Sequence, residues 1–63
     1  MRYMQIIEAR DVHDARSAYV LVLERRGISL DPTMSIHVET VHRAGQVHGS
    51  WLCYVAPAVQ HAA

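Results

Sequence analysis

One stretch of the chain carries both a start and a stop signal for a helix, and it runs Asp11-Val12-His13-Asp14-Ala15-Arg16-Ser17-Ala18-Tyr19-Val20-Leu21-Val22-Leu23-Glu24-Arg25-Arg26-Gly27. Asp11 is a good helix N-cap, and Asp14 brings negative charge to the positive end of the helix dipole. Two arginines bring positive charge to the other end, and Gly27 is the residue type that most often follows a helix. The sequence therefore predicts a helix over residues 12–26.

This helix has one apolar arc when its residues are turned by about 100° each. We expect the following side chains of that arc to be buried: Val12, Ala15, Ala18, Tyr19, Val22 and Leu23. Val20 and Leu21 lie outside the arc, and exposed branched side chains of this kind mark association surfaces. A rival interpretation makes residues 19–23 a strand, because this run is rich in β-branched and aromatic residues. The chain would then be nearly all β.

Three strands are expected around the helix. Residues 2–9 form the first, although adjacent Ile6 and Ile7 break strict alternation, so either both faces are partly covered or a bulge shifts the register. Residues 34–40 alternate cleanly between apolar and polar side chains, as a half-buried strand does. The returning strand is expected over residues 51–55.

The connections complete the prediction of an α+β fold. Asp31 and Pro32 suit a turn before the second strand, and residues 43–49 supply two glycines for a hairpin loop. Pro57 is expected to end the third strand. We expect a single β-α-β-β domain over residues 1–57, with one helix packed on a three-stranded, largely antiparallel sheet, and a flexible C-terminal tail over residues 58–63.

Size and charge exclude several classes of protein. The chain has 63 residues, and 51% of them are hydrophobic, which is too apolar a composition for intrinsic disorder. Its six basic and six acidic side chains balance, so its charge does not favour direct nucleic-acid binding. Cys53 is the one cysteine, which rules out an internal disulfide and suits a reducing compartment. The longest apolar run has six residues where a membrane-spanning helix needs about twenty, so we expect a cytoplasmic protein with no membrane partner.

The spacing of reactive side chains does not predict an active site. The histidines nearest the hairpin do not have the spacing of a metal site, and Cys53, in the middle of a strand, is expected to pack as a small hydrophobe. We therefore predict no catalytic residue, no metal and no cofactor. Two alternatives stay open: a minimal homo-oligomeric enzyme with His37 or His42 as general base at the subunit interface, and a nucleic-acid-binding regulator whose arginines the fold groups together.

Protein recognition fits the remaining side chains better. Trp51 and Tyr54 point to opposite faces of their strand, so one is expected under the helix and the other outward. Aromatic and arginine side chains are common interface anchors. The residues predicted to bind a partner are Arg16, Val20, Leu21, Arg25 and Tyr54. We also expect the chain to form a homodimer.

Three segments together resemble a known family of small phage-encoded proteins. They are residues 5–16, residues 38–41 and residues 51–54, which read as strand, acidic cap, helix and hairpin. The chain is most similar to the small anti-CRISPR proteins that act on type I surveillance complexes. The resemblance implies a non-enzymatic inhibitor of a host nucleoprotein complex, which would block the nucleic-acid site of that complex sterically.

Overall fold

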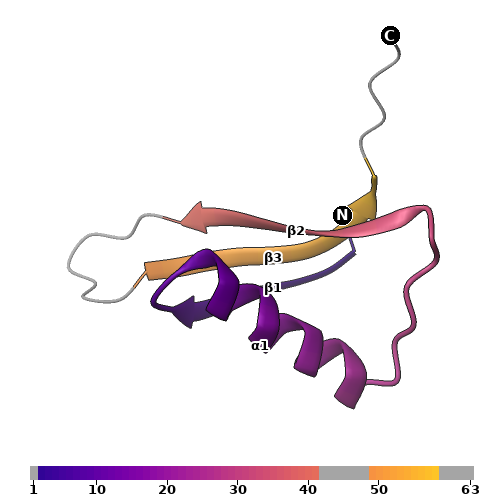
Figure 1. Ribbon diagram of the computed structural model, residues 1–63, viewed down its shortest axis with the longest axis horizontal. Helices are drawn as coiled ribbons and strands as arrows, with labels where there is room; N and C mark the ends of the chain where they lie inside the picture. The colour runs from indigo at the N-terminus through magenta and orange to yellow at the C-terminus, as the bar shows by residue number, and fades with distance from the viewer. Residues whose placement is uncertain (1, 42–48, 59–63) are drawn as a thin grey trace, which may run out of the picture.

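Four elements make up the fold in the computed structural model, which describes residues 2–41 and 49–58. In chain order they are β1 (Arg2–Ala9), α1 (Val12–Arg25), β2 (Met34–Val41) and β3 (Gly49–Pro57) (Figure 1). The predicted β-α-β-β order is confirmed, and each element ends within two residues of its predicted limit. The rival prediction of a strand over residues 19–23 is wrong, because this run lies inside α1.

Local signals set both ends of α1. The Asp11 carboxylate accepts a hydrogen bond of 2.9 Å from the backbone N–H of Asp14. At the other end Gly27 has a φ of 68°, its N–H donates to the Glu24 carbonyl, and the N–H of Ile28 donates to the Leu23 carbonyl, both at 3.0 Å. These two bonds form a Schellman motif, which satisfies carbonyl groups that the helix leaves unpaired.

The turn before β2 is held by Asp31. Its Oδ1 accepts hydrogen bonds of 2.8 Å from both the N–H and the hydroxyl of Thr33, and its carbonyl accepts one of 2.9 Å from the N–H of Met34. The backbone N–H of Thr33 is the main cause of a lowered pKa at the Asp31 carboxyl, followed by the Thr33 hydroxyl. The predicted turn is therefore confirmed.

The three strands form one antiparallel sheet with the order β1-β3-β2, so the last strand of the chain is the central one. Helix α1 lies across one face of this sheet (Figure 1). Between helix and sheet lies a core whose fully or nearly fully buried side chains are Ala15, Tyr19, Leu23, Cys53 and Val55. Trp51 packs at the margin of this core, so it is the aromatic residue of β3 that lies under the helix.

Two details differ from expectation. The register of β1 shifts between Arg2 and Gln5, where Tyr3 has a φ of 56°, and not at Ile6 and Ile7. Val12, expected in the buried arc, exposes 39% of its surface because it is the first helical residue, at the margin of the packed layer.

Some expectations concern residues outside the described ranges. The described ranges leave out residues 42–48, which include His42, His48 and most of the predicted hairpin loop. They also leave out residues 59–63 of the predicted tail. Within the described part of the chain, no helix has the length and apolar character needed to cross a membrane.

Candidate functional site

The face of the sheet opposite α1 is the first candidate surface. Side chains alternate along a strand, so neighbours of the core residues in β3 point away from the helix. Within the described ranges no helix covers these side chains. We call this side of the sheet the outer face, and its residues are Ile6, Glu8, Ser35, His37, Glu39, Val41, Ser50, Leu52, Tyr54 and Ala56. Two of them, Ser50 and Tyr54, are buried.

Four polar side chains of the outer face form a connected cluster. The rings of His37 and Tyr54, which are register partners, stack with centroids 5.1 Å apart and planes 6° apart. Ser35 Oγ lies 3.0 Å from His37 Nε2, and the Tyr54 hydroxyl donates a hydrogen bond of 2.7 Å to Glu39 Oε1. We call Ser35, His37, Glu39 and Tyr54 the outer-face cluster. These contacts fix the positions of its side chains before any partner arrives.

Tyr54 is more deeply placed than its position on an open face suggests. Its exposed fraction is 9%, because strand neighbours and the stacked His37 ring cover it. The hydrogen bond to Glu39 is the main cause of a raised pKa at the Tyr54 hydroxyl, with a smaller contribution from desolvation. Tyr54 therefore lies on the sheet face away from the helix, as expected, but its side chain is buried there and offers little accessible surface to a partner.

Apolar side chains lie beside the cluster. Ile6 of β1 pairs in register with Leu52 of β3, and Leu52 in turn pairs with Glu39 of β2. Ile6 exposes 44% of its surface. Ile6, Leu52 and Glu39 therefore form a row across the three strands, from an exposed branched side chain to a carboxylate that is hydrogen-bonded to Tyr54. Such a mixture of apolar and polar groups is typical of protein interfaces.

The charged groups divide between the two sides of the molecule. The outer face carries the carboxylates of Glu8 and Glu39 and no lysine or arginine. Arg16 and Arg25 are exposed on α1, on the other side of the sheet. Arginine and carboxylate side chains are thus unevenly distributed between the two sides, although the charge of the whole chain is balanced.

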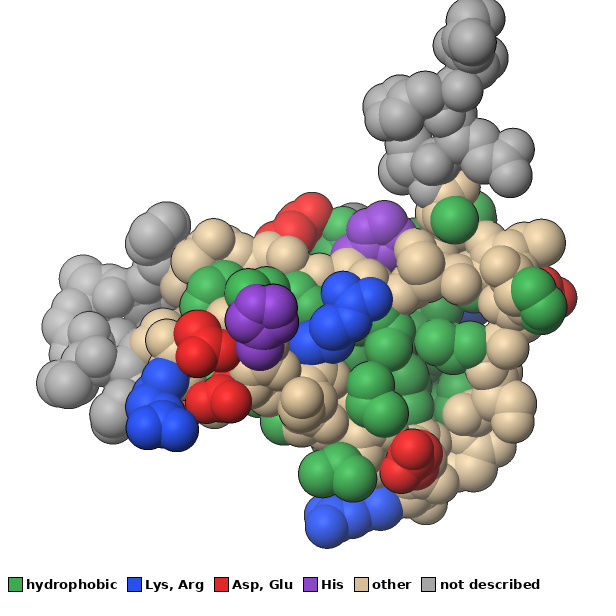
Figure 2. Space-filling model, in the orientation of Figure 1, with side chains coloured by type: hydrophobic (Ala, Val, Ile, Leu, Met, Phe, Trp, Pro, Cys, Tyr) green, Lys and Arg blue, Asp and Glu red, His purple; other side chains and the backbone are tan. Residues whose placement is uncertain are grey.

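The predicted partner-binding residues do not form one surface. Arg16, Leu21 and Arg25 are exposed on α1, where Leu21 exposes 52%, and Val20 is half-buried. Tyr54 lies on the opposite side of the sheet. The helix side is seen in Figure 2, where charged side chains follow α1 and hydrophobic ones gather between α1 and the connection to β2. A single flat partner therefore cannot touch all five.

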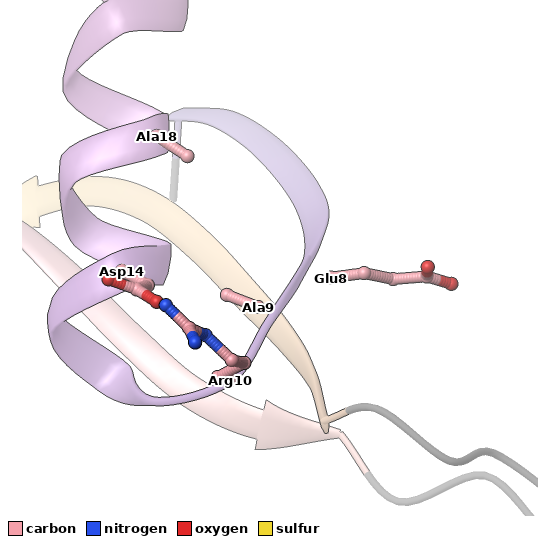
Figure 3. Close-up of a pocket in the computed structure, with 5 residues that line it drawn as sticks. All are labelled: Glu8, Ala9, Arg10, Asp14 and Ala18. Atoms are coloured by element: carbon pink, nitrogen blue, oxygen red, sulfur yellow. The ribbon is translucent and has the colours of Figure 1, made fainter.

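A hollow of about 460 Å³ lies where β1 turns into α1, lined by Glu8, Ala9, Arg10, Asp14 and Ala18. Arg10 reaches across its mouth toward Asp14, with Arg10 Nε 3.5 Å from Asp14 Oδ2, while Glu8 points away (Figure 3). The Arg10 side chain is 85% exposed, so this ion pair is screened by solvent and adds little stability. The hollow holds a surface salt bridge and two alanine methyl groups, and no acid–base pair oriented toward a ligand.

Cys53 is fully buried in the core, which confirms that it packs as a small hydrophobe. Its Sγ lies 4.0 Å from the carbonyl oxygen of Ala15 in α1, the distance of a weak contact. Burial raises the pKa of the Cys53 thiol, so the neutral form persists to higher pH than in water. In the described residues, histidine, cysteine and acidic side chains do not gather in groups of three that could hold a metal ion.

Comparisons with protein-family models, with curated proteins and with solved structures found no match for this chain. The resemblance to anti-CRISPR proteins therefore stays a prediction. Sequence reasoning missed the role of Ser35 and Glu39. Alternation in β2 already placed both on one face with His37, but the register that brings Tyr54 to them is visible only in the structure.

Proposed function

We propose that this chain is a small non-enzymatic protein-interaction module that binds a protein partner through its outer face. The observation that carries the proposal is the ordered outer-face cluster beside the exposed side chain of Ile6, on a sheet face that no described helix covers. Exposed apolar side chains next to fixed polar groups are what a protein interface requires. Because the cluster is already held in place, little side-chain entropy would be lost on binding.

The chemistry of the outer face favours a partner with an apolar spot next to basic groups. Leu52 and Ile6 would meet the apolar spot, and the carboxylates of Glu8 and Glu39 would pair with lysine or arginine. Surfaces that bind nucleic acid are basic. A module with this face would suit the predicted role of an inhibitor that occupies the nucleic-acid site of a host complex by steric means.

The experiment is a quantitative pull-down from bacterial lysate with two matched variants. Ile6→Arg changes an exposed apolar side chain on the outer face, and Leu21→Arg makes the same change on α1. We expect the wild type and Leu21→Arg to retain the same partner at micromolar bait, and Ile6→Arg to lose it. Loss with Leu21→Arg alone would move the binding surface to the helix, and a bait that retains nothing would contradict the proposal.

The two other functions expected from the sequence stay predictions. The general-base hypothesis has His37 within 3.0 Å of the Ser35 hydroxyl in its favour, and His42 lies outside the described residues. For the nucleic-acid hypothesis, DNA affinity that does not fall steeply with salt would argue against it. Solution mass together with a histidine-to-alanine series would separate the interaction module from the first alternative, because only the enzyme would lose an activity when its general base is removed.

A further inference from the structure

The outer edge of β2 is an unusually regular sheet edge. All eight residues of β2, from Met34 to Val41, pair with β3 without a register shift. The strand contains no proline, lysine or arginine, which are the residues that commonly protect an edge strand from pairing with another chain. Its side is also free of any other described strand, because the order of the sheet is β1-β3-β2.

The opposite edge differs in the features that discourage pairing. β1 begins with Arg2 and has a register shift before Gln5, and Tyr3 has a left-handed backbone there. An irregularity of this kind twists an edge away from an incoming strand. The two edges of one small sheet are therefore unequal, and β2 is the one that is ready to accept a further strand.

We propose that β2 pairs with β2 of a second copy of this chain, antiparallel and about a two-fold axis at Val38. With Val38 opposite itself, His37 of each copy lies opposite Glu39 of the other, and Ile36 lies opposite Thr40. Like residues then share a face, so both helices lie on one side and the two outer faces on the other. The two three-stranded sheets join into one continuous sheet.

Side-chain pairing favours this register over the two nearest ones. The two nearest registers that still place both helices on one side of the joined sheet are centred on His37 and on Glu39. They would put His37 opposite His37, or Glu39 opposite Glu39. Two carboxylates directly opposite each other in a sheet are unfavourable, whereas a carboxylate opposite an imidazole can accept a hydrogen bond from a ring N–H. Only the register centred on Val38 places each carboxylate against an imidazole. In the described residues Glu39 uses Oε1 for Tyr54, and no bond to its Oε2 is formed.

The same pairing would bury more apolar surface on the helix side of the sheet. Ile36 and Val38 are only half-buried at the margin of the core, because α1 packs mainly toward β1 and β3. In the pair, each Val38 would be covered by the other, and the apolar margins of the two cores would become continuous. A chain of this length buries a small core alone, so such an extension would add to its stability.

Analytical ultracentrifugation tests the pairing. We expect the wild type to reach twice its monomer mass of 7.1 kDa as concentration rises. His37→Glu places carboxylates opposite each other and should weaken the dimer by roughly tenfold or more. Adding Glu39→Lys to this variant should restore dimer formation, because opposite charges then face each other again. His13→Glu, the same change on an exposed position of α1, should leave the dimer intact.

Amide hydrogen exchange on the wild type provides a readout that needs no variant. We expect the amides of β2 that point away from β3 to exchange slowly at high protein concentration and rapidly on dilution. A chain that stays at 7.1 kDa up to about millimolar concentration would overturn the proposal. So would a dimer in which these amides exchange rapidly, since its interface would lie elsewhere.

Discussion

The Tyr19 hydroxyl donates a hydrogen bond of 2.7 Å to the carbonyl oxygen of Tyr3, sixteen residues away. Tyr19 is fully buried in α1, and Tyr3 is the non-glycine residue of β1 with a positive φ. A left-handed backbone costs a non-glycine residue about 1–2 kcal/mol. The bond gives a buried hydroxyl its partner, and thereby compensates part of this cost. The irregular start of β1 is thus coupled to the core of the helix layer.

Tyr19→Phe removes this hydrogen bond and keeps the ring. We expect the free energy of unfolding to fall by about 1–2 kcal/mol, because the Tyr3 carbonyl loses its partner. Urea unfolding measures the change. In the same variant, amides near Arg2 to Gln5 should exchange faster, while those of β2 keep their rates. Equal stability and unchanged exchange at the start of β1 would contradict the coupling.

Gly27 and Gly49 should both resist replacement by alanine, for different reasons. Gly27 has a φ of 68° and open space where a Cβ would lie, so Gly27→Ala should cost about 1 kcal/mol through backbone strain alone. At Gly49 a Cβ would lie 3.1 Å from Trp51 Nε1 and 3.3 Å from the Ala9 carbonyl oxygen. These two atoms are joined by a hydrogen bond of 3.0 Å that links β3 to the end of β1.

Gly49→Ala should therefore shift Trp51 and weaken that link, at a cost of about 1–3 kcal/mol. Tryptophan fluorescence reports the shift. We expect Gly49→Ala to change the emission of folded protein and Gly27→Ala to leave it unchanged. The same emission in both variants, with equal losses of stability, would show that crowding at Trp51 is not the cause.

Alkaline pH should destabilise the fold, and two of the groups responsible lie in the core between helix and sheet. Burial raises the pKa of the Cys53 thiol above its ordinary value of 9.0, and burial is also the main cause of the raised pKa of Tyr19. Each group has a higher pKa in the folded than in the unfolded protein. Its contribution to stability is therefore complete at pH values below the unfolded pKa, and it is lost as the pH rises through the folded pKa. Unfolding free energies should fall above about pH 9.

Cys53→Ala separates the two contributions. This variant lacks the thiol but keeps Tyr19, so its stability should decline less steeply between about pH 9 and pH 10 than that of the wild type. The folded wild type should also react slowly with thiol reagents, because the thiol is buried and neutral. A parallel decline in both proteins would show that Cys53 does not contribute.

Acid should act through Asp31. Hydrogen bonds from Thr33 lower the pKa of the Asp31 carboxyl below its ordinary value of 3.8. The contribution of this carboxylate to stability is therefore present at pH values above 3.8, and it is lost as the pH falls through the folded pKa. Asp31→Asn keeps an oxygen acceptor without the charge. We expect the variant to be less stable at pH 7 and to converge with the wild type below about pH 3. A stability difference that is constant with pH would exclude the carboxylate charge as its source.

Local signals account for the parts of the fold that the sequence predicted well. Asp11 and Gly27 set the ends of α1 through contacts within a few residues, and alternation over residues 34–40 set the faces of β2. The parts that were missed depend on contacts between distant residues. The distortion at Tyr3 involves Tyr19 on another element, and the outer-face cluster needs the register of β2 against β3. Neither is encoded in a short window of residues.

The strand order has a consequence for how the protein folds. Because β3 lies between β1 and β2, neither of those strands has a described neighbour to pair with until β3 is in place. A ribosome makes both flanking strands and the helix before it makes β3. This sheet therefore cannot assemble before the chain has been made past residue 49, and a transcript cut short there would encode a peptide that lacks the central strand.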